Sequence, residues 1–499
     1  MLLILVIYRT LYILKILWGF MGKFKTSAVL FVMGALCLTS FVPDAFCAGR
    51  TVAPVNTTMD VDTASFSKND FILKLQRTLS SGSVKDAISL YDEVPAEFAN
   101  DEDLLVLKAS LFVSDNQLNA AKSICLDLNS KNPSDPTVIE LLAYIAKLQG
   151  DSGNQNKYLK ALLAQDQYNV TANVEMAQSM FEGKNYKQAR LYYQKALVRE
   201  PDNEDVLFGL GQADYFLGGK DPSKDKEAEA TFKKILEKHP DYAPAYSYLG
   251  KIAAADNRYK IASDYVKKAI DIDASNYNYF IDYGMYESNL GHYDTAIQSW
   301  TNAIALQPEY FLAYAYRAGI YDEQNNLEKA VADYRNVVKY NPNYYFAYES
   351  LGILSLKASD WSGAREAFEK CYEMDKTGNI SYPLMITYCY YKEGNKLKAK
   401  NFSDKVLRKL DRNSIEYVML RVWHDESGEL PLPQKISALD NSNKKGKMYF
   451  YLGLYYELFG GVEMARENYA KVLSLKNPMF FEYRLAEWSL GSDNLAKVQ

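Results

Sequence analysis

Alanine returns along this chain at a spacing of 34 residues, and this periodicity constrains the fold more than any other feature of the sequence. A small residue stands twelve positions before most of these alanines, and a bulky apolar residue stands three positions before. A period of this length predicts an array of stacked repeats. The series is Ala87, Ala121, Ala189, Ala228, Ala262, Ala296, Ala330 and Ala364, with one alanine skipped and one interval five residues longer.

Each repeat has the pattern of two helices joined by a short turn. Within each half of the repeat, apolar residues recur at intervals of three and four, which places them on one face of a helix. The small residues allow the two helices to cross closely, and prolines such as Pro201, Pro308 and Pro342 end the second helix. One pair cannot bury its apolar faces alone, so we expect successive pairs to stack into an all-α solenoid.

These residues resemble the tetratricopeptide-repeat (TPR) family. The resemblance is clear in the unit from Tyr277 to Tyr310 and similar in the unit from Tyr345 to Gly378. It implies a right-handed superhelix of antiparallel helix pairs that ends in a C-terminal capping helix. In the first of these units the pattern consists of Phe280, Tyr283, Gly284, Tyr293, Ala296, Trp300, Ala303 and Pro308.

The pattern also divides the chain into segments. Residues 48–67 show little periodicity and are expected to be a flexible linker, and an array of about 12 units is expected over residues 68–479. Residues 414–445 lose the pattern, which predicts a distorted helical pair. Extra residues around Gly218–Pro222 predict a longer turn between two helices. Residues 480–499 are expected to hold the capping helix and a tail.

The first 47 residues are a candidate export signal or membrane anchor. If translation starts at Met21, two lysines precede an apolar run that ends before Ala48, which is typical of a cleaved signal peptide. Translation from Met1 adds a further apolar stretch, so a retained anchor within residues 1–42 is the alternative. In either case we expect an exported protein, periplasmic or associated with the cell envelope.

The composition argues against catalysis and against nucleic-acid binding. The chain has 57 Lys and Arg against 62 Asp and Glu, which excludes nucleic-acid binding by bulk positive charge. Its 3 histidines lie far apart and no phosphate-binding loop is recognisable, so we assign no catalytic, cofactor-binding or metal-ligating residue and expect no enzymatic activity. Cys125, Cys371 and Cys389 lack the spacing of a metal or disulfide site and are expected to be buried thiols.

Two functions remain open at this point. The resemblance implies a scaffold or adaptor that binds a segment of another protein in its concave groove. The end of the chain also looks like the end of bacterial cell-envelope TPR adaptor lipoproteins. The alternative is an accessory subunit of a cell-wall or polysaccharide enzyme that itself binds glycan or murein. Such a binder should carry exposed aromatic residues flanked by Asn, Asp or Gln on its inner face.

The inner face of the array gives candidate binding residues. In TPR solenoids, positions 2, 5, 9 and 12 of each unit line the inner curve, and in two neighbouring units these positions are mostly apolar. A contiguous apolar patch predicts an interaction site, with Asp322 at its rim. The alternative is that these side chains pack between neighbouring helices or against residues 414–445. The predicted partner-binding residues are Phe346, Glu349, Ile353, Leu356, Leu384, Tyr388 and Tyr391.

Overall fold

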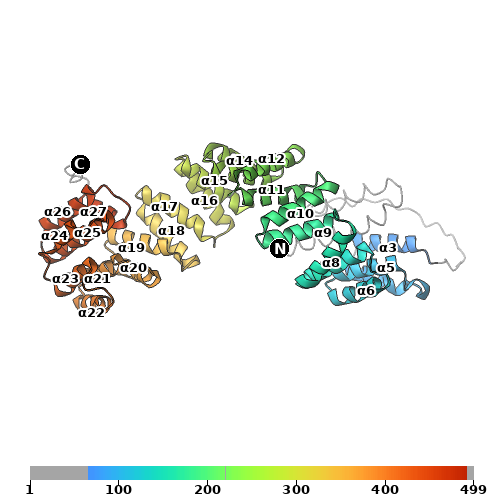
Figure 1. Ribbon diagram of the computed structural model, residues 1–499, viewed down its shortest axis with the longest axis horizontal. Helices are drawn as coiled ribbons and strands as arrows, with labels where there is room; N and C mark the ends of the chain where they lie inside the picture. The colour runs from blue at the N-terminus through green and yellow to red at the C-terminus, as the bar shows by residue number, and fades with distance from the viewer. Residues whose placement is uncertain (1–65, 82, 220, 492–499) are drawn as a thin grey trace, which may run out of the picture. The chain divides into compact units, whose positions relative to one another are not determined.

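The computed structural model describes residues 66–81, 83–219 and 221–491, and every regular element in these ranges is a helix (Figure 1). The predicted export segment, most of the predicted linker and the tail after residue 491 lie outside the described residues. The described part of the chain divides into two compact units, unit 1 up to Lys238 and unit 2 from His239 onward. The predicted all-α solenoid is confirmed.

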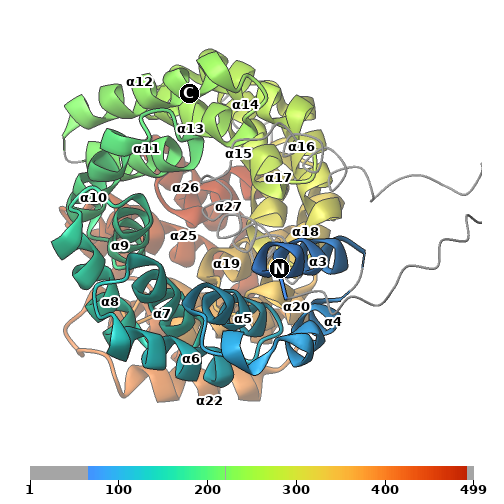
Figure 2. The same cartoon turned by 90° about the vertical axis from the view of Figure 1, so that its right-hand side faces the viewer.

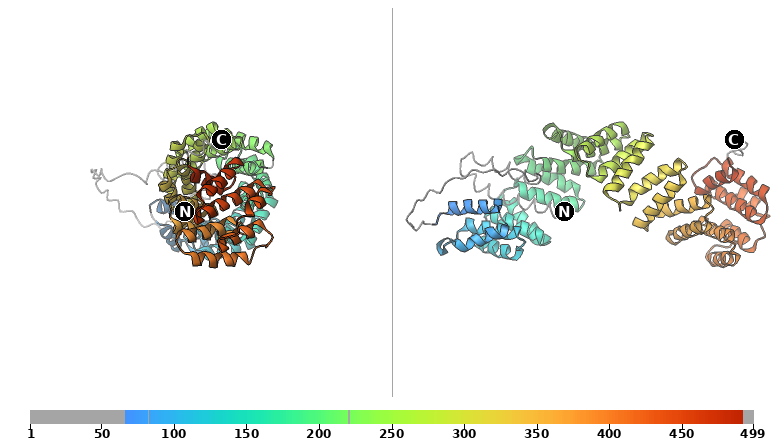
Figure 3. Two further views of the ribbon diagram at one scale, coloured as in Figure 1. Left: turned by 90° about the vertical axis from the view of Figure 1, so that its left-hand side faces the viewer. Right: turned by 180° about the vertical axis from the view of Figure 1, so that it is seen from behind.

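Unit 1 is built of helix pairs that follow one another along the chain (Figure 3). Its first pair is followed by two short 3₁₀ turns, which precede α5. The helices of unit 1 are α3 (Lys68–Ser81), α4 (Val84–Ser89), α5 (Glu102–Ser114), α6 (Leu118–Lys131), α7 (Pro136–Leu148), α8 (Ser152–Gln165), α9 (Val170–Glu182), α10 (Tyr186–Arg199), α11 (Glu204–Gly218) and α12 (Pro222–Lys238).

Unit 2 continues the helix pairs and ends in a single helix, α27. Its regular part is α13 (Ala243–Ala255), α14 (Tyr259–Ile272), α15 (Tyr277–Asn289), α16 (Tyr293–Leu306), α17 (Phe311–Glu323), α18 (Leu327–Tyr340), α19 (Tyr345–Lys357), α20 (Trp361–Met374), α21 (Ser381–Lys392) and α22 (Lys396–Leu407). The less regular end is α23 (Ile415–Asp425), the short α24 (Leu432–Ser437), α25 (Ser442–Phe459), α26 (Val462–Ser474) and α27 (Phe481–Leu490).

The small residues of the repeat lie where two helices cross. Ala296 and Ala330 are fully buried. At Gly284, a Cβ atom would lie 2.7 Å from Cε2 of the Trp300 indole, which is closer than side-chain atoms pack. The position therefore has room for a hydrogen atom only, and this close crossing is the physical reason for the small residues in the 34-residue pattern.

A left-handed residue marks the turn inside most helix pairs. Non-glycine residues with positive φ occupy several of these turns, among them Lys184 with φ 57° and Ser359 with φ 58°. Glycine takes the equivalent place at Gly150, Gly291 and Gly394. Only glycine adopts this conformation without steric cost, so the chain keeps the turn geometry even where its residue is unfavourable.

The longer turn expected around Gly218–Pro222 is wrong. The extra residues extend the helices, because α11 has 15 residues and α12 has 17, against 13 and 14 in the next pair. Pro222 is the first residue of α12, a position where proline fits because its missing N–H would have no partner inside the helix. A proline that reads as a turn signal is here a helix start.

In the described part of the chain, no helix is both long enough and apolar enough to cross a bilayer.

Candidate functional site

The apolar face predicted to bind a partner is covered by the chain's own C-terminal helices. Ile353, Leu384 and Tyr388 belong to one apolar core with residues of α23, α25 and α27, and α27 lies beside α25 (Figure 2). The expectation that these side chains face water is therefore wrong, because α25 and α27 fill the inner side of α19 and α21.

Polar contacts hold the same face in place. The Tyr388 hydroxyl donates to Glu457 of α25 over 2.8 Å, and the Tyr391 hydroxyl donates to the carbonyl oxygen of Trp423 over 3.0 Å. Glu349 accepts a hydrogen bond of 2.6 Å from the Tyr382 hydroxyl. These contacts tie α21 to α19, α23 and α25.

The remaining predicted residues differ in exposure. Leu356 is half-buried against the same core. Phe346, with 66% of its surface accessible, is the one member of the predicted set that is exposed. Its ring lies against the rings of Tyr344 and Tyr345. The structure therefore does not gather the seven predicted residues into an open groove.

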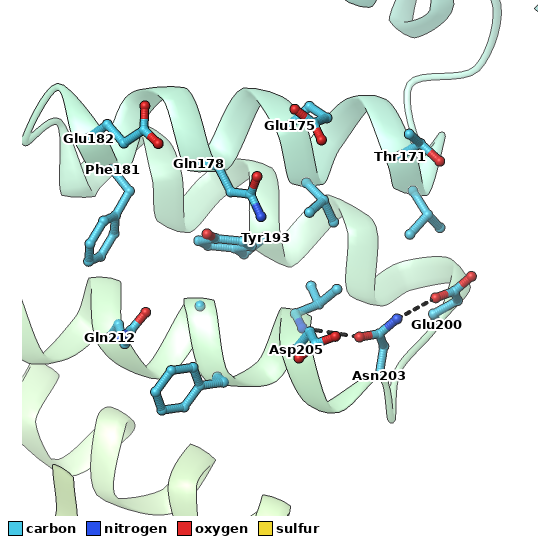
Figure 4. Close-up of a pocket in the computed structure, with 15 residues that line it drawn as sticks. Thr171, Glu175, Gln178, Phe181, Glu182, Tyr193, Glu200, Asn203, Asp205 and Gln212 are labelled. Carbon is cyan, nitrogen blue, oxygen red and sulfur yellow. Dashed lines mark hydrogen bonds between the residues drawn. The ribbon is translucent and has the colours of Figure 1, made fainter. Parts of the chain in front are cut away.

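An open groove does lie in unit 1, between α9 and α11 (Figure 4). It has a volume of about 520 Å³. Thr171, Gln178 and Phe181 of α9 face Gln212 and Asp205 of α11 across it. Both are first helices of their pairs, so this groove is the inner surface of two successive repeats.

The floor of the groove is Tyr193 of α10. Its side chain is buried, and its ring lies directly under Gly209 of α11, where a Cβ atom would lie 2.7 Å from ring atom Cε1. Burial, with the nearby carboxylates of Glu175 and Glu182, raises the pKa of Tyr193 to about 12. The floor is therefore a neutral phenol ring that lies in a negative electrostatic field.

Carboxylates line the groove, and they are not equally available. Glu175 is already paired with Lys147 of α7 at 2.7 Å and accepts a hydrogen bond from Gln155 of α8. Glu182 and Asp205, by contrast, are exposed side chains at the groove's edge. Glu182 lies at the end of the groove where Phe181 lies, and Asp205 lies toward the other end, beside Asn203 (Figure 4). The groove therefore has an exposed carboxylate toward each end, which would attract a basic ligand.

Apolar side chains alternate with these carboxylates. Val174 and Phe208 line the groove half-buried, and the Phe181 ring contacts the rings of Tyr186 and Phe216 at 5.1 and 5.5 Å between centroids. Phe216 is 44% exposed, so the aromatic surface continues to the solvent. The groove can therefore hold an apolar side chain of a ligand next to one of the ligand's cationic groups.

The sequence contained the signal for this groove. Positions 2, 5, 9 and 12 of the two units select Thr171, Val174, Gln178 and Phe181, then Asp205, Phe208, Gln212 and Tyr215, and all but the last line the groove. A second sequence pattern argues against an open binding face in residues 345–395. Residues 381–389 are apolar or small around the whole helix, which is typical of a helix buried on all sides, as α21 is.

Within the described residues, no three His, Cys, Asp or Glu side chains gather in an arrangement that could hold a metal ion. Cys125, Cys371 and Cys389 are buried free thiols, as the sequence predicts. Burial raises the pKa of each thiol, which keeps it protonated and unreactive.

Comparison with known proteins shows the same repeat. A family model described as "Tetratricopeptide repeat" matches residues 284–335 and 321–379. A second model with the same description matches residues 172–203, which cover most of α9 and all of α10. The two models together confirm the resemblance seen in the sequence.

Curated relatives are similar over part of their length. "Protein O-mannosyl-transferase TMTC3" of Homo sapiens is 25% identical over 46% of this chain and 27% of its own. "TPR repeat-containing protein MJ1428" of Methanocaldococcus jannaschii is 26% identical over 58% of this chain and 53% of its own. "TPR repeat-containing protein YpiA" of Bacillus subtilis is 23% identical over 65% and 84%. The chain thus spans between about a quarter and just over half of the first relatives it matches.

Among solved structures, YrrB, titled "a TPR protein with an unusual peptide-binding site", is 19% identical, covers 40% of this chain and 97% of its own, and has a TM-score of 0.31. A tetratricopeptide repeat protein from Parabacteroides merdae is 15% identical over 58% of this chain and 99% of its own, with a TM-score of 0.32.

Proposed function

This chain is a tetratricopeptide-repeat protein, and we propose that it is a non-catalytic scaffold that binds a basic segment of a partner protein in the groove between α9 and α11. The observation that carries the proposal is the combination of apolar and acidic side chains on one open inner surface. Val174, Phe181 and Phe208 would receive an apolar anchor, while Glu182 and Asp205 would pair with lysine or arginine. An extended or a helical segment would fit this inner surface.

A peptide library tests the proposal. We expect the full chain to select peptides with a lysine or arginine close to an apolar or aromatic residue, and the affinity to fall with rising salt. The double variant Glu182→Lys/Asp205→Lys should weaken binding of the selected peptide at least tenfold. The matched control is Glu97→Lys/Glu237→Lys, which makes the same charge change on exposed residues of unit 1 outside the groove. Equal affinity of the two double variants would contradict the proposal.

One observation favours glycan binding as the second candidate. Phe208 shares the groove with the amides of Gln178 and Gln212, and an aromatic ring next to amides is the arrangement expected of a sugar-binding surface. Recovery of the chain with purified sacculi, lost in a Phe208→Ala variant and kept in Glu182→Lys/Asp205→Lys, would favour this function over the first. The relative that is named a mannosyl-transferase is matched over only 27% of its length, and we propose no transferase activity for this chain.

We also propose that the protein acts outside the cytoplasm, at the bacterial cell envelope. The support is the apolar, lysine-preceded segment within residues 1–47. N-terminal sequencing of protein from its native cell tests this. A mature start at Ala48 is expected, whereas cytoplasmic protein that starts at Met1 or Met21 would contradict export.

A further inference from the structure

The C-terminal helix lies on the inner face of repeats far before it in the chain. Arg484 of α27 donates two hydrogen bonds, of 2.8 and 2.6 Å, to the two carboxylate oxygens of Asp322 on α17. Asp322 is largely buried, with 14% of its side chain exposed. A two-fold contact between guanidinium and carboxylate is among the strongest and most directional pairings in proteins. The geometry of Asp322 therefore favours arginine over other residues at position 484 of α27.

An aromatic residue completes the contact one turn later. Trp488 packs against the apolar core formed by α17, α18 and α19. Its ring lies under two cations, Arg484 at 4.3 Å and Lys357 of α19 at 4.9 Å from the ring centroid. Residues four apart lie on the same face of a helix, so α17 and α19 together recognise an arginine followed by an aromatic residue four positions later.

The fit of α27 has one defect. Glu482, two residues before Arg484, is fully buried. Its Oε1 atom accepts hydrogen bonds from the hydroxyls of Ser381 and Tyr451, but its Oε2 atom has no partner among the described residues. A buried carboxylate oxygen without a hydrogen bond costs free energy, so α27 is held less firmly than its burial implies. With 10 residues it is also too short to be a stable helix by itself.

We propose that the inner face of α17 and α19 is a binding site for helices of other proteins that carry arginine and, four residues later, an aromatic residue. In this structure α27 fills the site. A partner helix with glutamine in place of Glu482 keeps both recognition contacts and buries a neutral amide instead of a carboxyl group, so it displaces α27. This site lies in unit 2 and is independent of the groove proposed in unit 1.

The test uses the full chain and a labelled peptide of residues 478–492 in which Glu482 is glutamine. Fluorescence anisotropy should show saturable binding. The chain variant Arg484→Ala weakens the internal competitor and keeps Asp322, so it should bind the peptide at least tenfold more tightly than the unmodified chain. The chain variant Asp322→Asn removes the recognition group, so it should bind at least tenfold more weakly than Arg484→Ala.

This pair of variants separates recognition from stability. Both break the same ion pair, so a purely structural contact predicts similar thermal unfolding and equal, absent peptide binding. The control Arg466→Ala removes an exposed arginine of α26 and should change nothing. A folded Arg484→Ala chain that does not bind the peptide overturns the proposal. If that variant does not fold, Trp488→Ala takes its place, with the same expected gain in binding. A dimer that the peptide dissociates would assign the site to a second copy of this chain and would also overturn it.

Discussion

Gly284 of α15 lies directly against the indole ring of Trp300 in α16, with no space for a methyl group between them. Gly319 of α17 is a helical glycine in the opposite situation, because a Cβ atom there would have no neighbour within 4 Å. The same substitution should therefore act in opposite directions at these two positions of unit 2.

We expect Gly284→Ala to destabilise unit 2 by about 1–3 kcal/mol, because the added methyl group must push the two helices apart. Gly319→Ala should stabilise it by about 0.5–1 kcal/mol, because alanine favours the helix and meets no obstacle. Urea unfolding followed by circular dichroism measures both. Two shifts of the same sign would show that the close crossing does not determine the glycine.

Because the inner face of α21 is covered, truncating a side chain on it should destabilise the protein strongly. If the face were an open groove, the same change would have little effect on stability. Leu384 is fully buried, so Leu384→Ala should cost about 2–5 kcal/mol. Phe346→Ala, at an exposed position of the same predicted face, should change stability by about 0.5 kcal/mol or less. Differential scanning calorimetry of the two variants checks this, and similar melting curves would contradict the burial described here.

The turn between α19 and α20 contains a correctable strain. Ser359 has φ 58°, a conformation that costs a residue with a side chain about 1–2 kcal/mol. Ser359→Gly should therefore raise stability by about 1 kcal/mol, whereas Ser362→Gly, inside α20, should lower it by about 0.5–1 kcal/mol. Chemical unfolding distinguishes the two, and a loss at both positions would exclude relief of turn strain.

Glu349 gives unit 2 a pH dependence. Burial, with the neighbouring carboxylate of Glu482, raises the pKa of Glu349 above its ordinary value of 4.5, although Lys447 opposes the shift. A carboxyl group with a raised pKa in the folded state favours folding below its unfolded-state pKa. That stability is lost as the pH rises through the folded-state pKa.

We therefore expect Glu349→Gln to be more stable than the unmodified chain at pH 7, with a difference that shrinks toward pH 4.5. The amide oxygen of glutamine can still accept the hydrogen bond from Tyr382. Urea midpoints at four pH values between these limits give the slope. A difference that stays constant across this range would contradict the raised pKa.

Much of the fold follows from the sequence because its determinants are local. The buried alanines, Trp300 against Gly284 and the pattern's return after residue 445 depend on residues within one or two repeats. The candidate site is harder to predict from the sequence. Whether Ile353 and Leu384 face water depends on α25 and α27, which come much later in the chain. The hydrogen bond between Ser381 of α21 and Glu482 of α27, for example, joins residues 101 positions apart. Periodicity specifies which side chains share a face, and it carries no information on whether a distant segment covers that face.

The contact between Asp322 and Arg484 joins residues 162 positions apart in a fold whose other pairs mainly touch their neighbours. In an open array, unfolding enters from an end and proceeds one pair at a time. Here α27 contacts α17 and α19 as well as its neighbours α25 and α26. The two ends of the segment α17–α27 are therefore in contact with each other. Fraying of α27 cannot stay local, because its release also uncovers α17 and α19. A single proteolytic cut between α26 and α27 would thus expose the inner faces of α17 and α19, which precede the cut by eight helices or more.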